Sequence, residues 1–123
     1  MKVAISALGS DLDSQVDARF GRAQNFFFID TKTMKFEVVS NESAGEAMHG
    51  AGIQTSQLIS KKGVAAVITG NVGPNAFQTL SAAEILIYHA GKMSVLEAVE
   101  AFNNGELKQI TQSGPAHGGM GGR

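Results

Sequence analysis

Residues 49–77 read HGAGIQTSQLISKKGVAAVITGNVGPNAF, and this stretch decides the fold because it joins a helix, a buried strand and two glycine-rich turns. Apolar residues between Ile53 and Ile59 are spaced for one helical face, and Lys61-Lys62-Gly63 supplies the cations and the glycine that commonly end a helix. The run 64–69 is apolar and rich in β-branched residues, which is typical of a strand covered on both faces. The stretch therefore predicts a helix followed by a central parallel strand.

A glycine-rich turn, Gly70-Asn71-Val72-Gly73-Pro74-Asn75, follows that strand and leads into a second helix, whose first turn suits Pro74. Such a turn presents backbone N–H groups and the positive end of a helix dipole, so it can bind an anion. Alternatively, Gly70 and Gly73 only permit a tight connection. Neither the P-loop pattern nor the G-x-G-x-x-G pattern is present, so the turn indicates a site without naming its ligand.

The composition of the 123 residues narrows the function further. A net charge of −1 and the lack of a basic cluster argue against nucleic acid as a partner. The chain has no cysteine, which excludes disulfides, a thiol nucleophile and thiolate metal ligands. No apolar run is long enough for a signal peptide or a membrane span, so we expect a cytoplasmic protein with no membrane contact. We expect one domain over residues 1–112 and a flexible glycine-rich tail over 113–123.

The loop after the first strand carries charges of both signs. Asp11, Asp13 and Asp17 lack the glycine and the terminal glutamate of a calcium-binding EF-hand loop, so we interpret them as solvated carboxylates. Arg19 and Arg22 follow them. A guanidinium suits an oxyanion or a carboxylate, so these arginines either face an anionic ligand or pair with the nearby aspartates.

Four further segments complete the predicted sheet. Runs 25–30 and 34–40 predict a hairpin, and the three consecutive phenylalanines of the first run are interpreted as core and not as a base-stacking platform. Run 84–88 predicts another buried strand, and Ser94 opens a helix as half of a capping box. We expect a five-stranded mixed sheet in which the strands at Val3 and Val64 are adjacent and parallel. The hairpin extends one edge, and its second strand is expected to leave the sheet at the opposite end.

Three motifs in this order resemble the dinitrogenase iron–molybdenum cofactor family, which includes NifX-like small proteins and the carboxy-terminal domain of the cofactor synthase NifB. They are Arg19-Phe20-Gly21-Arg22-Ala23, His49-Gly50-Ala51-Gly52-Ile53 and Gly70 to Ala76. The resemblance implies a ribonuclease-H-like three-layer α/β fold without the nuclease carboxylates. It also implies a non-catalytic protein that binds an iron–sulfur or iron–molybdenum–sulfur cluster transiently, in cofactor biosynthesis or trafficking, with a cluster-donor or cluster-acceptor protein as partner.

Preassembled metal–sulfur clusters are anionic and bring their own sulfides, so a carrier needs only one or two ligands, some cations and exposed N–H groups. As metal ligands we predict His49, which is otherwise a polar turn residue, and His117, which otherwise belongs only to the tail; His89 is interpreted as structural. The predicted cofactor-binding residues, drawn from the three motifs, are Arg19, Arg22, Gly50, Gly52, Gly70, Asn71, Gly73 and Asn75.

Two other functions fit the same residues. The glycine turns could bind the phosphate or carboxylate of a small substrate in an enzyme, although no nucleophile or acid–base pair stands out. The chain could also be an interaction module in which the turns are purely structural. In the cofactor-binding hypothesis, His49, the two arginines and Gly70–Asn75 converge on one cleft at the carboxyl ends of the central strands.

Overall fold

The computed structural model describes residues 1–41 and 51–112, with side chains placed for 1–41 and 55–112, so His49, Gly50, His117 and the predicted tail lie outside the described residues. The elements, in chain order, are β1 (Lys2–Ala7), β2 (Asn25–Asp30), β3 (Phe36–Ser40), α2 (Ala51–Lys61), β4 (Ala66–Thr69), α3 (Pro74–Ala82), β5 (Leu86–His89), α4 (Val95–Asn103) and β6 (Lys108–Gln109).

The strands form one mixed sheet with the order β3-β2-β1-β4-β5-β6. β1 is parallel to β4 at the centre, and β2 and β3 form a hairpin on one edge, as predicted. The three-layer α/β class is therefore confirmed, but the predicted count of five strands is one too low. The missing strand, β6, has only two residues, both exposed, so no alternating apolar pattern marks it in the sequence.

The direction of β3 differs from the prediction. β2 is antiparallel to β1, and β3 is antiparallel to β2, so two reversals make β3 run in the same direction as β1. Asn25 pairs with both Ala7 and Ser40, which places the last residues of β1 and β3 at the same end of the sheet. The expectation that this strand leaves at the opposite end was wrong. We call the end that carries Ala7, Ser40, Thr69 and His89 the carboxyl edge.

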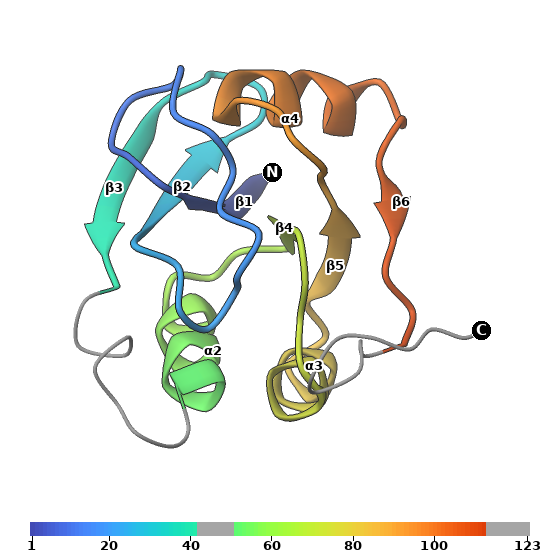
Figure 1. The fold of residues 1–123 in the computed structure, drawn as a ribbon. Coiled ribbons are helices and arrows are strands. Elements are labelled where there is room, and N and C mark those ends of the chain that lie inside the picture. Colours follow the sequence, from blue (N-terminus) through green and yellow to red (C-terminus); the bar gives the residue numbers. More distant parts are fainter. Residues whose placement is uncertain (42–50, 113–123) are drawn as a thin grey trace.

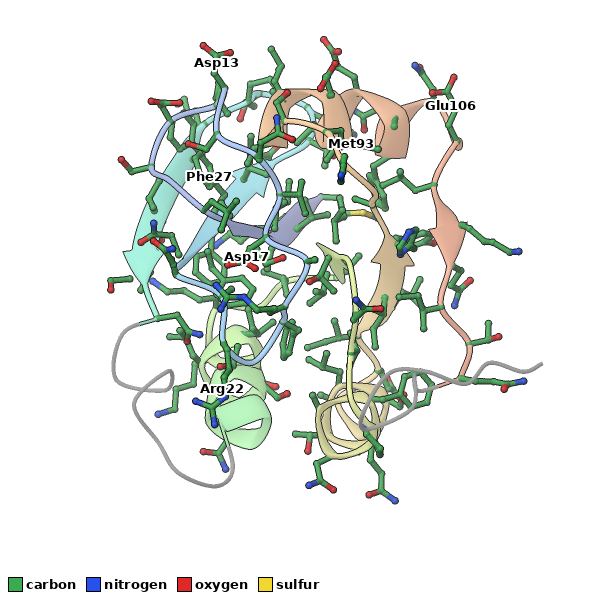
Figure 2. All side chains as sticks on the ribbon, in the orientation of Figure 1. Asp13, Asp17, Arg22, Phe27, Met93 and Glu106 are labelled. Carbon is green, nitrogen blue, oxygen red and sulfur yellow. The ribbon has the colours of Figure 1, made fainter. Side chains whose placement is uncertain are left out.

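Helices cover both faces of the sheet: α2 and α3 lie side by side against one face, and α4 covers the other (Figure 1). Alternate residues of each strand feed two buried clusters. Ala4 and Val67 pack with α2 and α3, whereas Val3 and Ile68 pack with α4. The three phenylalanines are divided in the same way, with Phe27 on the α4 face (Figure 2), and their core interpretation is confirmed.

Local signals set the ends of the helices. The Ser94 hydroxyl accepts a hydrogen bond from the Glu97 N–H (3.1 Å), and the Glu97 carboxylate accepts one from the Ser94 N–H (2.8 Å), so the predicted capping box is present. α2 ends at Lys61, and Gly63 adopts a positive φ of 69°, which a glycine accommodates without strain. No helix within residues 1–41 and 51–112 is long and apolar enough to cross a membrane.

Candidate functional site

A row of polar side chains crosses the sheet at the carboxyl edge. Neighbouring strands are in register there, so Thr69 lies opposite His89 and His89 lies opposite Lys108, and these side chains share the face covered by α2 and α3. The Ser6 hydroxyl continues the row, since it lies 2.7 Å from the Thr69 hydroxyl and shares a hydrogen bond with it. Polar groups from four strands thus meet at the edge where the sequence predicts a site.

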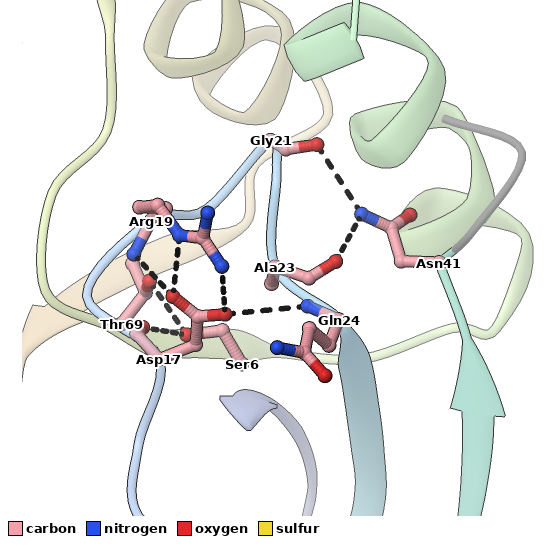
Figure 3. Close-up of polar contacts among 8 residues, drawn as sticks. All are labelled: Ser6, Asp17, Arg19, Gly21, Ala23, Gln24, Asn41 and Thr69. Atoms are coloured by element: carbon pink, nitrogen blue, oxygen red, sulfur yellow. Dashed lines mark hydrogen bonds and ion pairs between the residues drawn. The ribbon is translucent and has the colours of Figure 1, made fainter. Parts of the chain in front are cut away.

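Asp17 is buried beneath this edge and is paired with Arg19. Its side chain is 2% exposed, and its carboxylate accepts hydrogen bonds from Arg19 Nε and Nη2 (3.0 Å each) and from the N–H groups of Arg19 (3.0 Å) and Gln24 (3.2 Å) (Figure 3). The interpretation of Asp17 as a solvated carboxylate was wrong. Of the two alternatives for Arg19, the structure shows the one in which it pairs with an aspartate. The Arg19 side chain nevertheless remains 57% exposed at the rim.

This pairing fixes the charges of both groups. Burial alone would raise the pKa of Asp17, but the hydrogen bonds from the Arg19 side chain and from the Arg19 and Gln24 N–H groups outweigh it and hold that pKa below its usual range. The same hydrogen bond and charge raise the pKa of Arg19. Both groups therefore stay ionised at neutral pH.

Gly70 is required by the approach of the protein's own backbone. The Asn71 N–H donates to the Ala18 carbonyl (2.8 Å), and the Phe20 N–H donates to the Asn71 carbonyl (3.3 Å), so the two loops pair like strands. A Cβ on Gly70 would lie 2.7 Å from the Ala18 Cα. The structural interpretation of Gly70 therefore holds, and it brings Arg19 next to Asn71.

Gly73 is different, although it belongs to the same turn. Its φ is −74°, and a Cβ placed on it would meet nothing within 4 Å. It is the N-cap of α3, where no side chain caps the helix. Gly73 and the neighbouring Asn75 are both exposed, so within residues 1–41 and 51–112 nothing covers this helix end.

The first turns of α2 also lie at the carboxyl edge. The Asn41 side chain donates to the carbonyls of Gly21 (3.2 Å) and Ala23 (3.0 Å), and the Thr55 hydroxyl lies 3.3 Å from the Gly21 carbonyl. The Thr55 bond attaches the start of α2, which includes Gly52, to the loop that carries Arg22 (Figure 2), and the Asn41 bonds attach the end of β3 to the same loop. Both described ends of the chain that flank residues 42–50 are therefore at this edge.

A shallow pocket of about 290 Å³ lies beside the Gly70 turn. Residues 70–72, His89, Lys108–Ile110 and Gln112 line it. His89 Nδ1 lies 2.9 Å from the Gly70 carbonyl oxygen. The sequence-based site omits His89 and Lys108. His89 continues the alternation from Ile85 and Ile87 and follows a parallel strand, which is a usable signal, whereas Lys108 belongs to the strand that the pattern does not reveal.

The described part of the chain holds no group of three or more histidine, aspartate or glutamate side chains that could surround a metal ion, and cysteine is absent. A bare divalent cation has no cage in these residues. A group that brings most of its own ligands needs no such cage, so this donor set does not argue against a preassembled cluster.

Comparison with known proteins gives one family. A family model described as dinitrogenase iron-molybdenum cofactor matches residues 1–105. The apo form of the orange protein from Desulfovibrio gigas is 39% identical, with 90% of this chain and 93% of that chain covered and a TM-score of 0.87. A putative NifB protein from Thermotoga is 41% identical, with 90% and 94% covered and a TM-score of 0.80. An uncharacterized protein of Methanocaldococcus jannaschii is 28% identical over 113 residues, which cover 89% of this chain and 96% of that protein.

Proposed function

This chain belongs to the dinitrogenase iron-molybdenum cofactor family, and we propose that it binds an anionic iron–sulfur or iron–molybdenum–sulfur cluster as cargo and carries it in cofactor biosynthesis or trafficking. It acts without catalysing a reaction, and its partners are a cluster-donor or a cluster-acceptor protein. The observation that carries the proposal is the family match, which spans every described element from β1 to α4. One similar solved structure is an apo form, a term for a protein that lacks a group it can take up.

The chemistry of the carboxyl edge supports this proposal. Arg19 keeps more than half of its side chain exposed although it is bonded to Asp17, so it presents a positive charge at the rim. The N-terminus of α3 adds N–H groups and the positive end of its dipole, and no described residue would contact a Cβ placed on Gly73. We propose that the cluster lies against these groups. Arg22 and the start of α2, which includes Gly52, would flank it on the side of the loop between β1 and β2.

The remaining site residues stay predictions. His49 and Gly50 belong to the proposed site only through a sequence motif, and His117 only through its place in the glycine-rich tail. An enzyme that acts on a small phosphorylated or carboxylated substrate would use the same cations and helix terminus. It would also need an acid or a base. Asp17, the buried carboxylate within the described residues, is already committed to Arg19, which leaves the His89 imidazole beside the Gly70 turn as the candidate.

Anaerobic reconstitution tests the proposed function. The protein is incubated with iron(II), sulfide and molybdate under reductant and then desalted, and bound metal and visible absorbance are measured per chain. We expect iron and sulfide, with or without molybdenum, to elute with the folded protein in a fixed ratio, whereas the same mixture carried through with heat-unfolded protein should retain none. Elution of all metal away from the folded protein would contradict the proposal. Calorimetric binding of inorganic phosphate in its place would favour the enzyme.

A further inference from the structure

The ring of His89 has a defined proton position. Its Nδ1 lies 2.9 Å from the backbone carbonyl oxygen of Gly70, and a carbonyl oxygen only accepts hydrogen bonds. Nδ1 must therefore carry the proton, and in the neutral ring Nε2 keeps its lone pair. Metal-ligating histidines typically show this arrangement, in which the other ring nitrogen donates to a carbonyl or a carboxylate and so fixes the tautomer and the ring orientation.

The surroundings of His89 leave that lone pair accessible. His89 is the last residue of β5, is exposed, and lines the pocket beside the Gly70 turn. Within the described residues, the hydrogen bond to Gly70 is the one contact of the ring through nitrogen. Nε2 therefore has no hydrogen-bond partner among the described residues, and the bond from Nδ1 to the Gly70 carbonyl holds the ring at the carboxyl edge.

The pocket also has a positive charge. Lys108 lies directly opposite His89 in the antiparallel pairing of β5 and β6, so the two side chains share one face of the sheet. Among the residues that line the pocket, Lys108 is the one lysine or arginine, and none carries a carboxylate. A lysine beside the imidazole disfavours a bare metal cation and favours a species with net negative charge.

We propose that His89 supplies the protein ligand to the metal–sulfur cluster through Nε2, with Lys108 compensating the negative charge of the cluster. This proposal rests on the proposed function and assigns its ligand within the described residues. One imidazole is enough because the cluster brings its own sulfides, and imidazole is a suitable ligand for iron. The Gly70 turn, which is fixed by Ala18, then serves to orient His89.

A purely structural role for His89, tying β5 to the Gly70 turn, is the alternative to be separated by experiment. His89→Asn makes this separation because the asparagine amide nitrogen can occupy the position of Nδ1 and donate to Gly70, while nothing replaces Nε2. His89→Ala removes both functions. His89→Asn should therefore melt within about 2 °C of the wild type. If His89 has a structural role alone, His89→Asn should also bind metal like the wild type. If His89 is a ligand, the variant should bind less metal.

Two measurements test the proposal. In metal-free protein with 15N-labelled histidine, NMR should show the His89 ring with its proton on Nδ1, and anaerobic addition of iron(II), sulfide and molybdate should shift or broaden the Nε2 signal of His89. In the reconstitution assay, His89→Asn should lower metal affinity at least about tenfold, because even losing an outer-shell partner of a ligand costs about 10–100-fold.

The outcomes are distinguishable. If wild type and His89→Asn retain equal amounts of metal, or if the free ring carries its proton on Nε2, the assignment of His89 is overturned while the carrier function stands. If folded wild type retains no metal, both proposals fail. If only the NMR signals of His49 or His117 respond to the metal, the ligand is one of the two histidines predicted from the sequence, and the assignment of His89 is again overturned.

Discussion

The two halves of the carboxyl edge use similar polar residues in opposite ways. In the closed half, the loop 8–24 folds back over β1, and Ser6, Asp17 and Arg19 bond to one another or to the loop backbone. In the open half, His89 is the last residue of β5 and Lys108 is the first of β6, and within the described residues the His89 ring is hydrogen-bonded through one nitrogen. Polar residues at the end of a parallel strand therefore indicate a binding site only where no loop of the protein has already paired them.

The lengths of the connections explain the difference. The connection from β1 to β2 is long enough to return to the sheet and pair with the Gly70 turn, and its Val16 also bonds to the carbonyl of Met93 before α4. The connection from β4 to α3 is a short turn and cannot cover β5. The closed half therefore acts as a scaffold for the open half. Substitutions in the closed half should lower stability, whereas substitutions in the open half should lower binding.

Gly70→Ala should destabilise the folded protein the most. Its Cβ would overlap the backbone of Ala18, which cannot rotate away as a flexible side chain can, so the loop must move. We expect a loss of about 3 kcal/mol in the free energy of unfolding, at the upper end of overpacking effects. Gly73→Ala is the matched control, with open space around it and an ordinary φ of −74°. Denaturant titration measures both, and equal effects would show that the two loops are not locked together.

Gly70 and Gly73 also show which features of the fold could be predicted from the sequence and which could not. The strand–turn–helix order and the place of Pro74 in the first turn of the second helix follow from the pattern of residues 64–80, and the structure confirms them. The reason for Gly70 does not follow, because it depends on Ala18, a contact between residues far apart in the sequence. The burial of Asp17 was mispredicted for the same reason, since loop carboxylates are usually solvated and only tertiary structure supplies the Arg19 and Gln24 donors.

A smaller loss of stability, about 2 kcal/mol at pH 7, is expected for Asp17→Asn. Removing one partner of a buried ion pair costs about 3–5 kcal/mol, and the exposure of Arg19 reduces this cost. Because the pKa of Asp17 is lowered by folding, its contribution is complete above the unfolded-state pKa of about 3.9 and disappears as the pH falls through the folded-state pKa. The difference between wild type and variant should therefore shrink in acid, as followed by urea titration from neutral pH down to about pH 3.

Asp13→Asn serves as the control for Asp17→Asn, because Asp13 is an exposed residue in the same loop (Figure 2). It should change the free energy of unfolding by less than about 0.5 kcal/mol at either pH. A pH-independent effect of Asp17→Asn would mean that the carboxylate is not held ionised by its partners. The Asp17–Arg19 ion pair would then not stabilise the closed half.

The capping box at α4 should give the next smaller effect. Ser94 caps the helix onto which the closed half docks, since the Val95 and Leu96 N–H groups donate to the Ser14 and Leu12 carbonyls. We expect Ser94→Ala to cost about 1 kcal/mol in unfolding free energy and to leave metal retention unchanged. Ser81→Ala, at an exposed position inside α3, is the control and should be neutral. Loss of metal in Ser94→Ala would show that stability and binding are not separable along this edge.

The site could be predicted only in part, because its residues come from two kinds of signal. Motifs of glycine and arginine mark the turns, and the structure brings Arg19 and Asn71 together as neighbours. His89 and Lys108 carry no motif. They become a pair only through the pairing of β5 with β6, a strand of two residues that has no apolar alternation. The open half therefore depends on sheet register, which single-sequence patterns do not supply for so short a strand.

The smallest effect on stability, and one that isolates the open half, is expected for Lys108→Gln. Lys108 is exposed on β6, so the free energy of unfolding should change by less than about 0.5 kcal/mol. Metal retention in the reconstitution assay should nevertheless fall about fivefold at low salt, which corresponds to about 1 kcal/mol for one cation beside a bound anion, and this difference should narrow at high salt. Lys35→Gln makes the same change of charge in the β2–β3 turn. This turn lies at the end of the strands opposite the carboxyl edge, so the variant should retain metal like the wild type. Equal losses in both variants would mean that the cluster responds to net charge and not to the pocket, and Lys108 would then have no place in the site.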